Sequence, residues 1–174
     1  MLLSVLELKK SKHPYSSEKY EEFKKINTEL LGLSIDSFFA HISWVRSLKE
    51  NFGVEIQFPI IEDLSMKVAK SYGMIHPGAG DTSAVRATFI IDPKSIIRAM
   101  VYYPMSNGRS IDEIFRLVNA LQETQKTGFA RPEAWRPGES LIVPPPKITK
   151  DTEERLKLNY DVTEVLFENE RYLA

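Results

Sequence analysis

Two arginines occupy positions from which a cation can reach a bound ligand. Arg86 stands directly before the apolar run 87–91, and Arg109 follows an Asn-Gly pair just ahead of a predicted helix. A guanidinium at the end of a buried strand can present charge to a ligand, although an ordinary surface arginine is the commoner finding. The 174 residues include no cysteine, which excludes disulfides, thiolate metal sites and thiol mechanisms within this chain. The residues alone therefore offer two cations without a nucleophile, and they leave the function open.

The three histidines do not predict a metal site. No Glu or His stands three or four residues after His13, His41 or His76 to complete a ligand set. The glycines of loop 73–80 also lack the spacing of a dinucleotide or phosphate loop. His41 and Trp44 lie three residues apart on a predicted helix, and a pair at the edge of the core is favoured over a ligand contact. We therefore expect neither a metal nor a cofactor.

The charge balance favours neither nucleic acid nor an anionic membrane as a partner. The chain carries 23 Lys and Arg against 24 Asp and Glu, so its formal net charge is -1. The opening residues 1–6 are apolar but too short for a membrane span, and no basic segment precedes them as in a signal peptide. We expect a cytoplasmic protein.

A β-hairpin and the helix after it must position the two arginines. Residues 87–91 and 96–103 are rich in β-branched and aromatic side chains, and residues 92–95 between them favour a tight turn. The first run is almost continuously apolar, which predicts that both faces of that strand are covered. Ser110 and Glu113 have the spacing of a capping box and predict the start of a long helix.

The rest of the chain predicts an α/β sheet of the thioredoxin kind, with other small α/β folds as alternatives. Residues 1–8 suit either a strand or a short helix. The other predicted elements are a helix capped by Ser16 or Ser17 and running through Lys25, a strand over 30–35, a helix with an apolar stripe from Phe38 to Phe52 that ends at Gly53, a strand over 58–61, and a short helix over 65–72 that ends at Gly73.

The composition changes after Gly128. Five prolines fall between residues 132 and 146, which predicts an extended segment that lies over another part of the molecule. A charged helix over 149–158 is expected to follow. We therefore divide the chain into a domain over 1–128 and a proline-rich C-terminal extension over 129–174.

Ten short motifs follow one another from residue 31 to residue 145. They are Leu31-Gly-Leu-Ser-Ile-Asp36, His41-x-x-Trp44, Phe58-Pro-Ile-Ile61, Val68-Ala69 with Tyr72-Gly-Met-Ile-His-Pro77, Arg86-Ala-x-Phe-Ile-Ile-Asp-Pro93, Ile97-Arg98, Tyr102-Tyr-Pro104, Gly108-Arg109, Trp135-x-Pro-Gly138 and Ile142-Val-Pro-Pro145. In this order they resemble the peroxiredoxins of the AhpC/TSA type, and the tail motifs resemble the one-cysteine, peroxiredoxin-6-like subclass. The resemblance implies a thioredoxin-like sheet flanked by helices, thiol-dependent reduction of hydrogen peroxide and organic hydroperoxides, a hydroperoxide and a thiol reductant as partners, and a homo-oligomer.

The resemblance does not extend to the nucleophile of the family. The peroxidatic cysteine sits in a Pro-x-x-x-Thr-x-x-Cys loop that should fall near Lys9 or Lys10, where none of its residues is present. By resemblance, Arg86 matches the arginine that lowers the thiol pKa and steadies the peroxide oxygens, and Arg109 matches a second arginine that supports it. Serine and threonine hydroxyls are too weakly acidic without a paired base, and methionine would be consumed stoichiometrically. We expect no thiol peroxidase turnover.

Three hypotheses are consistent with these residues. The first is a peroxiredoxin-family chain without its own nucleophile. The second is a non-catalytic pseudoenzyme or interaction subunit that assembles with an intact relative. The third is a shortened reading frame whose upstream sequence carries the cysteine. The apolar residues 1–8 are expected either to insert as a replacement strand in the sheet or to leave the subunit dependent on a partner.

Overall fold

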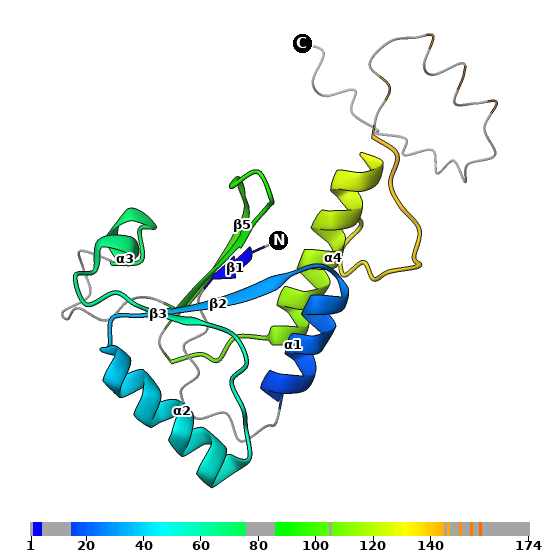
Figure 1. The fold of residues 1–174 in the computed structure, drawn as a ribbon. Helices are drawn as coiled ribbons and strands as arrows, with labels where there is room; N and C mark the ends of the chain where they lie inside the picture. The colour runs from blue at the N-terminus through cyan, green and yellow to red at the C-terminus, as the bar shows by residue number, and fades with distance from the viewer. Residues whose placement is uncertain are drawn as a thin grey trace.

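The computed structural model describes residues 2–4, 15–75, 86–104, 106–144, 146, 150, 154 and 157, and it describes side chains from residue 19 onward. The described chain forms strands and helices around a single sheet (Figure 1). In chain order these elements are β1 (Leu2–Ser4), α1 (Tyr15–Lys25), β2 (Glu29–Ser34), α2 (Phe38–Phe52), β3 (Ile60–Glu62), α3 (Lys67–Ser71), β4 (Arg86–Ile91), β5 (Ile97–Tyr103) and α4 (Ile111–Thr127).

The first strand lies in the middle of the sheet. The strand order is β3-β2-β1-β4-β5, with β1 parallel to β2 and antiparallel to β4. Leu3 stands opposite Leu30 of β2 on one side and Ile90 of β4 on the other. Of the two alternatives for residues 1–8, the strand is therefore confirmed at Leu2–Ser4, where it inserts into the sheet. Residues 5–8 lie outside the described part of the chain.

The predicted hairpin is confirmed. β4 and β5 pair antiparallel, with Arg86 opposite Tyr103 at the open end of the hairpin. β4 is buried along nearly its whole length, as its continuous apolar run predicts. Residue 95, in the turn, adopts a φ of 61°, a left-handed conformation that glycine accommodates more easily than the serine found here.

Asp92 holds the turn end of the hairpin together. Its carboxylate is buried, and Oδ1 accepts hydrogen bonds from the backbone N–H groups of Lys94 (2.8 Å) and Ile96 (3.0 Å). Its Oδ2 accepts a bond from Arg98 Nε at 2.8 Å. The Ile96 N–H, followed by Arg98 and Lys94, holds the pKa of Asp92 below its ordinary value, although burial acts in the opposite direction.

Replacing Asp92 with asparagine is expected to make the free energy of unfolding depend less on pH in the acidic range. Because the folded pKa lies below the unfolded value, ionised Asp92 stabilises the fold above the unfolded pKa, and this contribution is lost as the pH falls through the folded pKa. The wild-type chain should thus lose stability more steeply than Asp92→Asn on acidification. Urea unfolding midpoints at stepped pH values measure the difference, and parallel profiles would contradict the prediction.

Two apolar clusters cover the two faces of the sheet. Side chains alternate along β4, so Ile90 faces α1 and α4 while Ala87 and Phe89 face α3. The α1/α4 cluster consists of Tyr20, Phe23, Leu30, Phe58, Ile90, Ile114 and Val118. The α3 cluster consists of Leu33, Ala69, Met74, Ala87, Phe89 and Ile91. In Figure 1, α1 and α4 lie side by side and α3 lies across the sheet from them.

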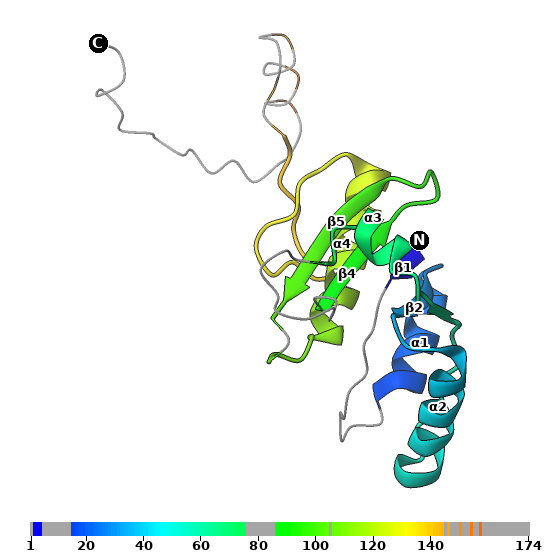
Figure 2. The same cartoon turned by 90° about the vertical axis from the view of Figure 1, so that its left-hand side faces the viewer.

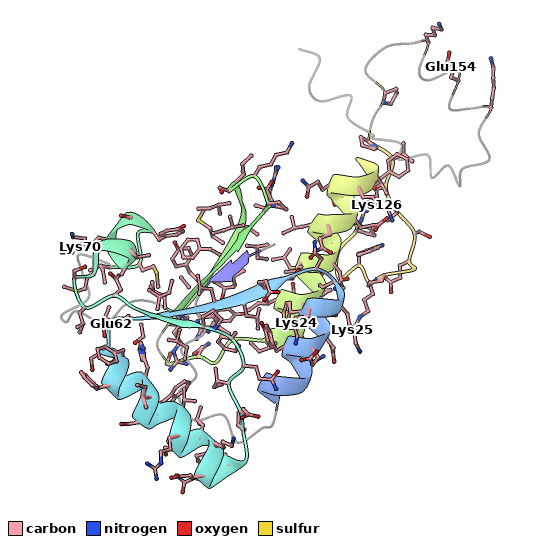
Figure 3. All side chains as sticks on the ribbon, viewed as in Figure 1. Lys24, Lys25, Glu62, Lys70, Lys126 and Glu154 are labelled. Carbon is pink, nitrogen blue, oxygen red and sulfur yellow. The ribbon has the colours of Figure 1, made fainter. Side chains whose placement is uncertain are left out.

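Helix α2 has the ends that the sequence predicts but not the burial. Ser37 Oγ accepts a hydrogen bond from the Ala40 N–H, and Gly53 closes the helix with a φ of 65°. An apolar stripe of this kind normally faces a core, yet Ile42 is 61% exposed and no α2 side chain is buried. The helix contacts β3 and extends away from the sheet in both views (Figures 1 and 2). Glu62 of β3, labelled in Figure 3, accepts the Phe38 N–H at the start of α2.

Two helix starts differ from those predicted. Helix α1 already includes Tyr15, so Ser16 and Ser17 lie within it and do not cap it. Helix α3 begins at Lys67, where the buried Asp63 carboxylate accepts the N–H groups of Val68 (3.2 Å) and Ala69 (2.7 Å). The helix therefore begins two residues later than predicted, and the Asp63 carboxylate satisfies N–H groups of its first turn.

The segment after α4 packs over another part of the molecule as predicted, but residues 130–142 turn back on themselves instead of running extended. Helix α4 ends at Gly128, and Ala130 then forms an isolated bridge with Ile142. Trp135, which lies between Ala130 and Ile142 in the sequence, is buried. Its carbonyl oxygen accepts a hydrogen bond of 3.2 Å from Arg116 of α4. The expected helix over 149–158 lies outside the described residues except for Lys150, Glu154 and Lys157. None of the helices in the described ranges combines the length and apolar character that a membrane span requires.

Candidate functional site

The open end of the hairpin carries Arg86. It is the first residue of β4, stands opposite the last residue of β5, and is half-buried. Its Nη1 donates a hydrogen bond to the carbonyl oxygen of Asn107 at 2.9 Å. Asn107 belongs to the loop between β5 and α4, so this bond attaches the start of β4 to the chain just before α4.

Arg109 makes the complementary contact. Its Nη1 donates to the carbonyl oxygen of Ala87 at 3.3 Å. Each arginine therefore binds a backbone carbonyl close to the other arginine. Arg86 binds that of Asn107, two residues before Arg109, and Arg109 binds that of Ala87, the residue after Arg86. This arginine clasp, consisting of Arg86 and Arg109, joins two segments about twenty residues apart in the sequence and places two guanidinium groups at one end of the hairpin.

The clasp leaves buried polar atoms without a partner among the described residues. Arg86 Nε and Thr88 Oγ1 are both buried and make no hydrogen bond there. Residues two apart on a strand share a face, so Arg86 and Thr88 lie on the same face of β4. Buried donors are costly when unpaired, so these two atoms mark this face of β4 as a candidate for polar contacts. Sequence reasoning missed Thr88, although its position two residues after Arg86 was the available signal.

The acidic residues in the first turn of α4 pair with other cations. Glu113 accepts two hydrogen bonds from Arg116, each of 2.7 Å, and Arg116 holds the pKa of Glu113 below its ordinary value. Asp112 Oδ1 lies 3.0 Å from Lys19 Nζ, and the pKa of Lys19 is raised by Glu22 and by Asp112. Glu113 thus forms an ion pair within α4, and Asp112 joins α4 to Lys19 of α1.

The clasp can bind and polarise an oxygen ligand but cannot itself attack one. Arginine supplies donors and positive charge and remains protonated. Thr88 is the hydroxyl on the same face, and it has no hydrogen-bonded base among the described residues to activate it. Charge stabilisation is therefore the chemistry that this site offers.

The histidines form no second site in the described part of the chain. His41 and Trp44 are both half-buried on α2, but neither belongs to the two apolar clusters of the described residues. Both ring nitrogens of His41 are buried without a described partner. No cluster of three or more His, Asp or Glu with the geometry of a metal site exists among the described residues. His13 and His76 lie outside those residues, and so does the part of loop 73–80 from His76 onward.

Two family models match the chain in succession. The AhpC/TSA family matches residues 10–100, and the C-terminal domain of 1-Cys peroxiredoxin matches residues 120–158. The first match includes Arg86, and Arg109 lies between the two matches.

Relatives with similar sequences carry the same family name. A peroxiredoxin of Aquifex aeolicus is 50% identical over 155 residues, which cover 83% of this chain and 70% of the relative. A peroxiredoxin of Methanosarcina mazei is 51% identical over 142 residues, which cover 78% of this chain and 65% of the relative. The chain thus spans about two thirds of the length of these relatives.

Solved structures agree on the fold. The yeast mitochondrial 1-Cys peroxiredoxin superimposes with a TM-score of 0.72 at 32% identity, covering 82% of this chain and 73% of that one. A mutant of peroxiredoxin 6 of Arenicola marina superimposes with a TM-score of 0.73 at 28% identity, covering 88% and 74%. The expected thioredoxin-like sheet flanked by helices is confirmed. The chain belongs to the AhpC/TSA family and is a peroxiredoxin homologue.

Proposed function

We propose that this chain provides the peroxide-binding arginines of a thiol-dependent hydroperoxide reductase without providing the sulfur nucleophile. The reciprocal contacts of Arg86 and Arg109 carry this proposal, because they hold two cations beside buried donors that lack a partner among the described residues. Hydrogen peroxide and organic hydroperoxides are the substrates, and a thiol is the reductant, as the family implies.

The chemistry divides between the clasp and a thiolate. In the proposed reaction a thiolate attacks one peroxide oxygen, the O–O bond breaks, and the departing oxygen takes a proton. Arg86 stabilises the negative charge on that oxygen, and Arg109 positions the backbone beside Arg86. The 174 residues contain no cysteine, and an isolated threonine hydroxyl is too weakly acidic to replace one. The chain alone should therefore bind peroxide oxygens without turning them over.

Steady-state peroxide consumption tests this directly. Purified chain with excess dithiol should consume hydrogen peroxide and an organic hydroperoxide no faster than the dithiol alone. Two variants accompany it, Arg86→Ala and Arg46→Ala, because Arg46 is an exposed arginine on α2 that pairs with Glu50 far along the chain from the clasp. Turnover that disappears in Arg86→Ala and survives in Arg46→Ala would reveal another nucleophile and overturn the proposal.

A second candidate function is that of an interaction subunit that assembles with an intact peroxiredoxin. The exposed apolar side chains of α2 favour it, because Phe38, Phe39 and Ile42 are each more than half exposed in the isolated chain. Gel filtration of the chain mixed with a cysteine-containing relative should then give a mixed species that neither protein forms alone. Separate elution of the two proteins would exclude this function.

The proposal also covers the oligomeric state, the domain boundary and the cellular location of the chain. The family implies a homo-oligomer, and the exposed apolar side chains of Phe38, Phe39 and Ile42 on α2 support one. The left-handed C-cap at Gly128 supports a boundary between a domain over 1–128 and an extension over 129–174. A cytoplasmic location completes the proposal.

A further inference from the structure

All sulfur in this chain is carried by methionine. The sequence has five methionines and no cysteine. Met66, Met74 and Met100 lie in the described part of the chain, and Met1 and Met105 lie outside it. A thioether reacts with hydroperoxides in proportion to the access that the oxidant has to the sulfur, so burial separates the three described residues.

Met100 is the most accessible of these three. Its side chain is 57% exposed, whereas Met74 is 2% exposed within the α3 cluster. Met66 is half-buried against the same cluster. A hydroperoxide in solution therefore meets the sulfur of Met100 without any opening of the fold.

The position of Met100 in the sheet explains its exposure. It lies on β5 directly opposite Phe89, so both side chains point to the face that carries the α3 cluster. Helix α3 is only five residues long and packs over Ala87 and Phe89, and Tyr72 at its end accepts a hydrogen bond from Tyr102 of β5, while Met100 stays exposed. Figure 2 shows β5 beside β4 at one border of the sheet.

We propose that Met100 is the methionine of the described part of the chain that reacts first with hydroperoxides, forming methionine sulfoxide. A lone pair of the thioether attacks the outer peroxide oxygen, an S–O bond forms and the O–O bond breaks. The departing oxygen leaves as water or an alcohol after taking the peroxide proton. Sulfur loses two electrons and the hydroperoxide gains them, so each Met100 side chain consumes one equivalent of peroxide.

This reaction does not depend on the proposed role of the clasp. Arg86 and Thr88 lie on the face of β4 with Ile90, and Met100 lies on the opposite face with Phe89. Replacing Arg86 should therefore leave the oxidation of Met100 unchanged. Peroxide turnover in the steady-state assay and sulfoxide formation at Met100 can consequently succeed or fail separately.

Peptide mapping by mass spectrometry tests the proposal on the full chain. After timed exposure to hydrogen peroxide or an organic hydroperoxide, Met100 should gain one oxygen at least about tenfold faster than Met74. In denaturant the oxidation rates of Met100 and Met74 should converge, because both sulfur atoms are then exposed to the oxidant. Met100→Leu, which conserves side-chain volume, should remove one equivalent of rapid peroxide consumption.

Three results would overturn the proposal. Oxidation of Met74 as fast as that of Met100 in the folded chain would show that burial does not control the reaction. Oxidation confined to Met1 or Met105 would assign the reactive sulfur elsewhere. Slower oxidation of Met100 in Arg86→Ala than in Arg46→Ala would show that the clasp takes part.

Discussion

The substitution of Leu3 by proline is expected to destabilise the fold by roughly 3 kcal/mol or more. Leu3 is the middle residue of β1, which is paired on both sides in the centre of the sheet. Proline removes a backbone N–H from the ladder and leaves a carbonyl of a neighbouring strand unpaired, and its ring does not fit between two flanking strands. Because a domain is stable by only about 5–15 kcal/mol, much of the population should unfold.

Circular dichroism during urea unfolding measures this effect. Leu3→Val is the matched control, because valine keeps the N–H and suits a strand. Hydrogen exchange adds an independent readout, since the amides of Leu2–Ser4 that face a neighbouring strand should exchange slowly. Equal unfolding midpoints for Leu3→Pro and Leu3→Val, together with rapid exchange, would mean that the sheet does not need β1.

The substitution of Phe23 by alanine should cost about 3–5 kcal/mol. Phe23 is completely buried between α1 and the sheet, and its ring meets that of Phe115 of α4 edge to face at a centroid distance of 5.1 Å. Truncation removes the apolar contacts of a full ring and leaves a cavity that the α1/α4 cluster fills only in part. The urea midpoint should fall while the slope of the transition stays the same.

Phe52→Ala provides the contrasting measurement. Phe52 is the last residue of α2 and is 53% exposed, so its truncation should change stability by only about 0.5 kcal/mol or less. A loss as large as that of Phe23→Ala would show that the apolar side of α2 is covered in solution. The same loss appearing only at high protein concentration would identify another copy of the chain as the cover.

Short-range signals in the sequence determined several elements and part of the site. The turn residues between two β-branched runs identified the hairpin, and Ser110 identified the start of α4, where its Oγ accepts the Glu113 N–H. These features depend on residues within a few positions of each other, so the local chain fixes them. Composition alone likewise excludes thiol chemistry within this chain, because none of its residues is a cysteine.

Only the tertiary structure decided how distant segments meet. The sequence named Arg86 and Arg109 separately, but the clasp arises because the open end of the hairpin lies against the loop before α4. The central position of β1 depends on pairing with β2 and β4, and the apolar residues 1–8 suited a helix as well. The stripe of α2 predicted a helix correctly, yet its exposure depends on what other elements reach it. Periodicity reports which face of an element is apolar, and only the assembled fold determines whether anything packs against that face.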